Sequence, residues 1–263
     1  MWGTVGNIGA LASIIGISAT NWFSDPTKAW IALAMFILLL LFAGWRTYAV
    51  TTHFLKQHYP KGYLPLSAAS KWTTSDGKNV SYELIRHIQI KRPVMTYFDH
   101  KFFWSGTKDP VVNSVLQTPS VLTGTDGETS KTCRLHFRTY KKFNEVEVLQ
   151  ILMEIDDSDE ASSPHLAHRV ESPIRLITFE VELLHADKKY FGKHAKLCRS
   201  SLEKGESAIV EHLKLIPFNS MTRSYSLQLP DPEPGFKYIF SWERPPVQTQ
   251  YKPKSEKSWK QAA

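Results

Sequence analysis

The sequence contains little cysteine and no obvious cluster of metal ligands. Its two cysteines, Cys133 and Cys198, are far apart, with no CxxC motif and no histidine-rich spacing around them. This excludes a disulfide scaffold and gives no support to a zinc or redox site. At 263 residues the chain can bury a hydrophobic core without covalent crosslinks. We therefore expect two inert thiols, no metal and no cofactor.

The sequence also lacks the short motifs of common enzymes. A P-loop, a dinucleotide-binding fingerprint and zinc-finger spacing are all absent from it. Ser105 follows Phe-Trp and does not stand in the GxSxG motif that exposes a nucleophile. Asp99 and His100 are an adjacent acid and base, but neighbouring residues on a strand point to opposite faces of a sheet. We therefore predict no catalytic residues and a protein that is not an enzyme.

One acidic run contains residue types that can bind a divalent cation. Carboxylates and imidazoles are ordinary metal ligands, but the spacing in this run matches no defined metal-binding loop. We therefore predict a solvated hairpin loop there. The residues concerned are Asp156, Asp157, Asp159, Glu160, His165 and His168.

Charged residues are almost absent from the first fifty positions. Ala29–Trp45 is a run of seventeen residues without a charge or a proline. At about 1.5 Å per residue this run nearly crosses a bilayer core, and the helix can continue past Arg46 if that side chain snorkels. Trp30 and Trp45 bracket the run, and Trp22 precedes it, as interfacial anchors do. The run predicts a transmembrane helix; the alternative, a buried core helix, seldom lacks polar residues over four turns.

A second uncharged stretch, Trp2–Phe23, precedes this run. It is rich in small residues, which allow helices to pack closely in lipid. We predict a helical hairpin that turns at residues 24–27, with a helix in the membrane interface or lining a pore as the alternative. The small residues proposed for helix packing are Gly6, Gly9, Ala10, Ser13 and Gly16.

Positive charges follow the second predicted span. Arg46, Lys56 and Lys61 lie after it, whereas the short loop before it has only Lys28, with Asp25 nearby. The positive-inside rule therefore places the C-terminal part of the chain in the cytoplasm. In a bacterium the membrane would be the inner membrane.

The remainder of the chain alternates in the manner of β-strands. In 177–183 and 236–242, apolar residues occupy every second position, which predicts strands with one buried face. Further strands are predicted at 80–90, 94–104, 132–140, 145–155 and 225–229, and a helical turn at 206–215. No βαβ rhythm is present, so the fold class is mainly β, an antiparallel β-sandwich or partly open barrel. The predicted parts are a transmembrane hairpin (1–50), a linker (51–66), a cytosolic β-rich domain (67–245) and a flexible tail (246–263).

A basic stripe marks one predicted strand. Arg134, His136 and Arg138 share one face of 132–140, and Lys141 and Lys142 follow directly. Such a face can hold phosphates through charge-assisted hydrogen bonds. We predict these five residues as a candidate ligand-binding site; an ordinary solvated face, or one lying against anionic lipid, is the alternative.

This organisation resembles the membrane effectors of bacterial anti-phage systems. The resemblance rests on the small-residue first span, the tryptophan-bracketed second span and the β-rich domain that follows. It implies that the β domain senses a nucleotide or a partner protein as its trigger, and that the spans form a homo-oligomer that breaches the lipid bilayer. The soluble domain is larger than in the compact two-span effectors that bind cyclic nucleotides, which leaves the trigger open. The alternative is a membrane-tethered scaffold protein.

Overall fold

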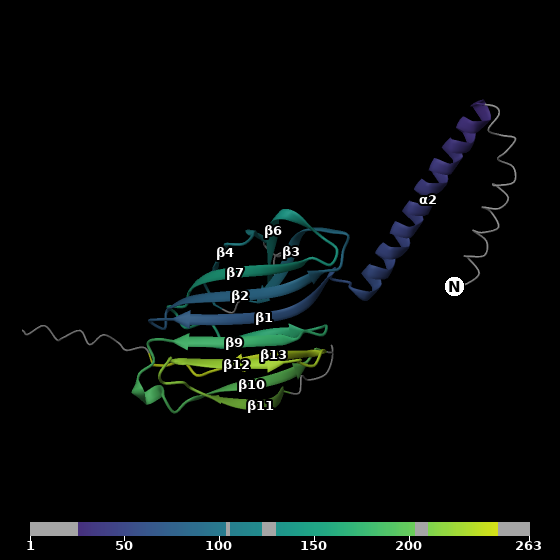
Figure 1. Cartoon of the computed structure of the whole chain (residues 1–263). Coiled ribbons are helices and arrows are strands. Elements are labelled where there is room, and N and C mark those ends of the chain that lie inside the picture. The colour runs from purple at the N-terminus through teal and green to yellow at the C-terminus, as the bar shows by residue number, and fades with distance from the viewer. Residues whose placement is uncertain (1–25, 104–105, 123–129, 203–209, 247–263) are drawn as a thin grey trace, which may run out of the picture. The chain divides into compact units, whose positions relative to one another are not determined.

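The computed structural model describes residues 26–103, 106–122, 130–202 and 210–246 (Figure 1). The chain divides into two compact units, Met1–His58 and Tyr59–Ala263. The first contains the helix α2 (Pro26–His58), and the second contains a β domain.

Helix α2 is a single continuous helix of 33 residues. Pro26 occupies its first turn, where the missing N–H costs nothing, and Lys56 and His58 in its last turn interact favourably with the helix dipole. The helix ends just before Tyr59-Pro60, because a residue that precedes proline disfavours helical backbone. The structure therefore confirms the predicted helix and extends it to His58.

The surface of α2 is apolar on all sides from Ala29 to Trp45. Its most apolar 18-residue window has a mean hydropathy of 2.0, and none of that window is buried. Trp30 and Trp45 are exposed by 70% and 65%, and Arg46 is exposed next to Trp45. The helix is thus long and apolar enough to span a membrane.

The predicted two-helix hairpin is not shown by the structure. The first predicted span, 2–23, lies outside the described residues, and α2 is the one helix in the described part that could span a membrane. The packing and anchoring roles of the residues in the first span therefore remain predictions. These residues are Gly6, Gly9, Ala10, Ser13 and Gly16, with Trp22 at the end of the span.

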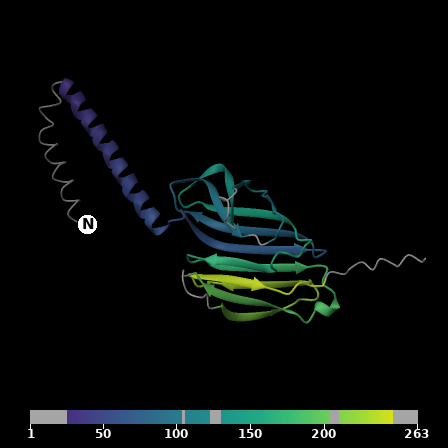
Figure 2. The ribbon, with the colours of Figure 1, turned by 180° about the vertical axis from the view of Figure 1, so that it is seen from behind.

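The β domain consists of three open sheets. The largest has six strands in the order β12-β9-β1-β2-β7-β4, and the others have the orders β11-β10-β13-β8 and β3-β6-β5. Figure 2 shows these layers from behind. The strands are β1 (Tyr63–Thr74), β2 (Asn79–Ile90), β3 (Val94–Phe103), β4 (Val111–Asn113), β5 (Thr118–Leu122), β6 (Ser130–Lys142), β7 (Val146–Asp156), β8 (His165–Val170), β9 (Leu176–Leu183), β10 (His194–Ser201), β11 (Val210–Pro217), β12 (Ser224–Pro230) and β13 (Phe236–Ser241), and the short 3-10 helix η1 is Lys188–Tyr190.

The core lies between the six-stranded sheet and the two smaller sheets. Phe179 of β9 stacks on Phe240 of β13 at 5.7 Å between ring centroids, and both side chains are fully buried. Tyr63 of β1 packs against Phe98 of β3 at 5.0 Å. Core-facing residues of β1 are paired with core-facing residues of β2 and β9, as at Trp72. The side chains that contact the two smaller sheets therefore lie on one face of the six-stranded sheet, and both smaller sheets cover that face. The architecture is a β-sandwich.

Three details differ from the predicted fold. The sheets are open, so the barrel alternative was wrong. The sandwich is not purely antiparallel, because β1 pairs with β9 in parallel from Ser67 to Thr74. In the predicted helical turn 206–215, the described part from Val210 onward is strand β11, because it pairs with β10 along the edge of a sheet.

The seven predicted strands are all confirmed, as β2, β3, β6, β7, β9, β12 and β13. The predicted linker 51–66 instead contains the end of α2 and the start of β1. The sequence analysis missed β1, β4, β5, β8 and β10, of which β1 lies at the centre of the large sheet.

Replacing Phe240 with alanine should destabilise the β domain. The side chain is fully buried and stacked on Phe179, so its loss leaves a cavity that costs about 3 to 5 kcal/mol. Phe143→Ala is the matched control, because that ring is 48% exposed. Guanidinium unfolding of the full chain in detergent measures both variants. Equal midpoints for the two would contradict the assigned core.

Candidate functional site

The predicted basic stripe lies on β6, in the three-stranded sheet. Cys133 and Leu135 point into the core and are fully buried, whereas Arg134, His136 and Arg138 lie on the opposite face. The alternation predicted from the sequence is therefore confirmed. Burial raises the pKa of the Cys133 thiol to about 11, which keeps it protonated and unreactive.

Arg134 has a carboxylate partner on the neighbouring strand. Its Nε and Nη2 donate to the two carboxylate oxygens of Asp99 at 2.7 and 3.0 Å, and its guanidinium lies 4.0 Å from the ring of Tyr97. The hydrogen bond to Asp99 raises the pKa of Arg134. Asp99 thus occupies the bidentate fork that a phosphate would use.

The other four basic residues also have contacts within the domain. The ring of His136 lies 3.3 Å from the hydroxyl of Ser120, and Arg138 donates to the carbonyl of Val115 at 3.0 Å. Lys141 forms an ion pair with Glu147 at 2.6 Å. The ammonium of Lys142 lies 5.8 Å from the ring of Tyr140. The structure therefore places all five residues along one strand, and a phosphate bound there would compete with Asp99 and Glu147.

Asp99 and His100 point to opposite faces of β3, as predicted. Asp99 is on the outer face with Arg134, whereas His100 is buried. Ser105 lies outside the described residues. Asp99 and His100 are thus not arranged as a joint acid and base.

The acidic run 156–160 is only partly the solvated loop that was predicted. Asp157 is fully buried; it forms an ion pair with Arg244 at 2.7 Å and accepts hydrogen bonds from the backbone and hydroxyl of Ser162 at 3.0 and 2.6 Å. The prediction that Asp157 is exposed was wrong. Its buried ion pair is formed with Arg244, which is distant in sequence, so the local sequence pattern did not indicate this contact. Asp156 is exposed and paired with Lys108, whose hydrogen bond lowers the pKa of Asp156 to about 2. Among the described residues no three potential metal ligands gather.

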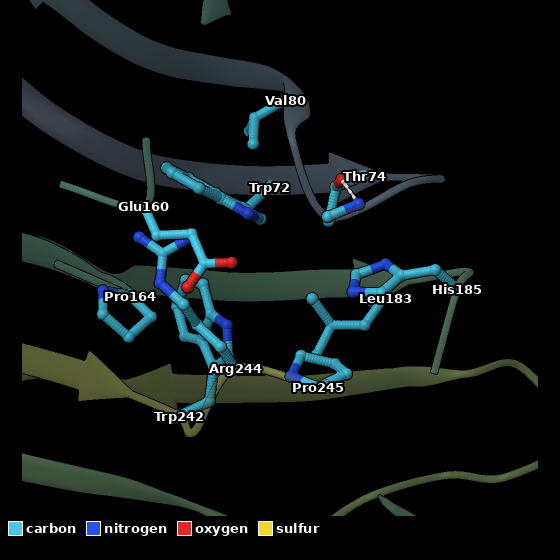
Figure 3. Close-up of a pocket in the computed structure, with 11 residues that line it drawn as sticks. Trp72, Thr74, Val80, Glu160, Pro164, Leu183, His185, Trp242, Arg244 and Pro245 are labelled. Atoms are coloured by element: carbon cyan, nitrogen blue, oxygen red, sulfur yellow. Dashed lines mark hydrogen bonds between the residues drawn. The ribbon is translucent and has the colours of Figure 1, made fainter. Parts of the chain in front are cut away.

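A small hollow opens beside this ion pair, between the end of β1 and the segment that follows β13. Trp72 and Trp242 meet there at 5.6 Å, nearly edge to face. The lining residues with ionisable side chains are Arg244, Glu160 and His185. Figure 3 shows these side chains directed toward the hollow. Its volume is about 20 Å³, enough for about one water molecule.

The hollow offers hydrogen-bonding groups but no catalytic arrangement. The Nδ1 atom of His185 is buried and has no hydrogen-bond partner in the described part of the chain, and burial lowers the pKa of this histidine. The guanidinium of Arg244 is already paired with Asp157. The space suits an ordered water and is too small for a nucleotide. The sequence analysis missed this site because its residues come from separate segments.

A second group of polar side chains lies within the sandwich. Arg86, His100 and His168 interact electrostatically there, and Nε of Arg86 has no hydrogen-bond partner among the residues that the structure describes. Burial, with the positive charge of Arg86, lowers the pKa of His100 and lowers that of His168 to about 3. Both imidazoles are therefore neutral at physiological pH, and they help to fill the core.

Comparison with known proteins gives no family for this chain. No family model and no curated protein matches it. Among solved structures it is similar to an M1 zinc metallopeptidase from Deinococcus radiodurans, with 8% identity over 69% of this chain and 42% of that one, at a TM-score of 0.36. It is also similar to the full-length major pilin RrgB from Streptococcus pneumoniae, with 10% identity over 68% of this chain and 37% of that one, at a TM-score of 0.22. The matched region is thus under half the length of either structure, and likenesses at these scores carry no argument about function.

Arg244→Met should destabilise the β domain, because it leaves the buried carboxylate of Asp157 without its cation. Breaking such a pair costs about 3 to 5 kcal/mol, and Asp157→Asn added to Arg244→Met should recover part of the loss. Arg175→Met is the control, because the ion pair of Arg175 with Asp231 is exposed and worth at most about 1 kcal/mol. Denaturant midpoints test the three variants, and equal effects of the two single substitutions would refute this role of Arg244.

Proposed function

We propose that this is a membrane-anchored binding protein, with its β domain on the cytoplasmic side of the bacterial inner membrane. The observation that carries the proposal is the apolar surface of α2, which is exposed along a full membrane-spanning length. Exposing an apolar surface of that size to water is unfavourable for a monomer, whereas burying it in the hydrocarbon core of a bilayer is favourable.

The flanking residues of α2 support both the anchoring and the orientation. Trp30 and Trp45 stand near the two ends of the apolar segment, as aromatic side chains do at membrane interfaces. Arg46, Lys56 and Lys61 follow the segment, and the positive-inside rule assigns that side to the cytoplasm.

The output that we propose is membrane damage in anti-phage defence. In this proposal the β domain receives a nucleotide or a partner protein, and the N-terminal segments of several copies then assemble in the bilayer. The support is the resemblance to two-span effectors and the small-residue spacing of Gly6, Ala10 and Ser13, which suits close helix contact.

A second candidate function is that of a membrane-tethered scaffold. Strand β11 forms one edge of the four-stranded sheet, and its Val210, Leu213 and Leu215 are exposed. An exposed edge of this kind can add a strand from a partner protein. In this candidate the membrane segment serves only as an anchor.

The full-length protein should remain with the membrane after carbonate extraction. Apolar burial along α2 is far greater than a peripheral contact provides. The test is immunoblotting of the pellet and the soluble fraction, with a known peripheral protein as the control. Release of the full-length chain together with that control would refute membrane anchoring.

Gly6→Leu combined with Ala10→Leu should separate the effector from the scaffold. The added side chains keep the segment apolar, so insertion should persist, but they obstruct close packing, so toxicity or phage protection should fall at least about tenfold. Thr4→Leu with Ser18→Leu is the matched control, because helical spacing would place these positions on the face opposite the proposed packing residues. Induced expression with a membrane-potential dye and phage plating provide the readouts. Full activity of the Gly6/Ala10 variant with normal insertion would favour the scaffold.

A further inference from the structure

One end of the β domain combines aromatic rings with cations that have no carboxylate partner among the described residues. Three segments meet there: the chain entering from α2, the β2–β3 connection and the β6–β7 hairpin. Backbone hydrogen bonds hold them together, from Lys91 N to the Gly62 carbonyl at 2.9 Å and from Asn144 N to the Ile90 carbonyl at 2.8 Å. We name this surface the tip patch; it consists of Tyr59, Lys91, Arg92, Tyr140, Lys142 and Phe143.

Two rings of the tip patch are exposed, Tyr59 is half-buried, and all three lie close to the cations of the patch. Tyr140 and Phe143 are 59% and 48% exposed. The ammonium of Lys91 lies 5.6 Å from the ring of Tyr59 and 5.5 Å from that of Phe143, and Lys142 lies 5.8 Å from the ring of Tyr140. Val94 and Val146, both more than half exposed, extend the apolar part of this surface. A surface that places rings and ammonium groups side by side matches the interfacial zone of a bilayer.

The charge of the tip patch is positive. The nearby carboxylates of Glu147 and Glu171 are paired with Lys141 and Lys61, which lie beside the patch. Glu145 accepts a hydrogen bond from the backbone N–H of Lys142. Within the described part of the chain, Lys91, Arg92 and the ammonium of Lys142 have no carboxylate partner. An anionic lipid surface supplies the missing negative charge.

The covalent structure brings the tip patch close to lipid headgroups. Its first residue, Tyr59, directly follows His58, the last residue of α2. The apolar segment of α2 is centred near Leu38, so Tyr59 lies about 31 Å along the helix from the bilayer midplane. The headgroups end at about 20 to 22 Å from the midplane, and a helix tilted by about 40° brings Tyr59 to within a few Å of them.

A tight turn secures Arg92 at this place. Gly62 has a φ of 76°, and a Cβ there would lie 1.8 Å from Nε of Arg92, so the arginine side chain crosses directly over this glycine. Arg92 also donates to the carbonyl of Pro60 at 3.5 Å. The turn thus holds a cation over the first residues after the helix.

We propose that the tip patch docks onto the anionic bilayer surface beside α2, with Tyr140 and Phe143 inserted at headgroup depth. The domain is then held to the membrane at two places, the helix and the tip patch. The opposite end, with the tryptophan-lined hollow, is left facing the cytoplasm. This inference rests on the proposed membrane anchoring by α2.

Site-specific fluorescence on the full chain in nanodiscs tests the docking. Both native cysteines are replaced with alanine, and an environment-sensitive probe is attached at Phe143→Cys. In discs with 30% phosphatidylserine the probe should shift to shorter wavelength and be quenched by shallow doxyl lipids, and both effects should weaken in phosphatidylcholine discs. The control site is Met221→Cys, which is 93% exposed and lies in the loop before β12, at the opposite end of the strands. Its probe should report water in both kinds of disc.

Charge reversal provides the second arm of the test. Lys91→Glu with Lys142→Glu should shift the equilibrium at position 143 toward water by at least about 30-fold, since each basic residue near an anionic surface contributes about 1 kcal/mol. Lys188→Glu with Lys189→Glu changes the net charge equally at two exposed lysines of helix η1 and should leave the signal unchanged. Equal losses in both variants would refute docking through this patch.

A probe at Phe36→Cys in α2 distinguishes failure of docking from failure of anchoring. Quenching by lipid at position 36 with a water-like probe at 143 in anionic discs would refute docking alone. A water-like signal at both positions would refute the membrane anchoring and the docking together. Quenching at both positions, with the charge dependence described above, is the expected result.

Discussion

The apolar surface of α2 is the constraint on which the organisation of this protein depends. Large hydrophobic side chains are exposed on every side of its apolar segment. Moving this surface from water into an apolar environment stabilises the protein by about 25 cal/mol for each Å² of apolar area. In the proposed function, the hydrocarbon core of the bilayer provides that environment for the apolar segment from Ala29 to Trp45. The β domain begins at Tyr59, directly after the last residue of α2, so a membrane-spanning helix would tether the domain near the lipid surface.

Within the β domain, strand β1 has the corresponding central role. It pairs with β2 on one side and, in parallel, with β9 on the other, and so joins the early and late strands of the domain into one sheet. Its two ends mark different chemical environments. The end at Tyr63 lies beside the positive tip patch, and the end at Trp72 and Thr74 lines the small hollow next to the Arg244–Asp157 pair. The two ends of β1 therefore lie at two different surfaces, the positive tip patch and the tryptophan-lined hollow.

Strong alternation explains which parts of the fold could be predicted from sequence. Strands β9 and β13 have one buried and one partly covered face, and their apolar residues recur at every second position. Strand β1 was missed because it faces the core with small residues such as Ala68 and Ser70, so its pattern is faint. The alternation of β6 placed Arg134 correctly, but its partner Asp99 could not be foreseen, because the register between β3 and β6 is set by tertiary packing. The burial of Asp157 and the assembly of the tip patch depend on contacts between distant segments in the same way.

Spin-label accessibility along α2 is the most direct test of the central claim, that this helix crosses the membrane. Labels placed one at a time from position 29 to position 48 of the full chain in nanodiscs are compared for collisions with oxygen and with a water-soluble nickel chelate. A spanning helix predicts a smooth rise in the ratio of oxygen to nickel collisions toward the middle, near Leu38, and a fall at both ends. A ratio that instead oscillates every 3.6 residues would show a helix lying in the interface and would contradict the account.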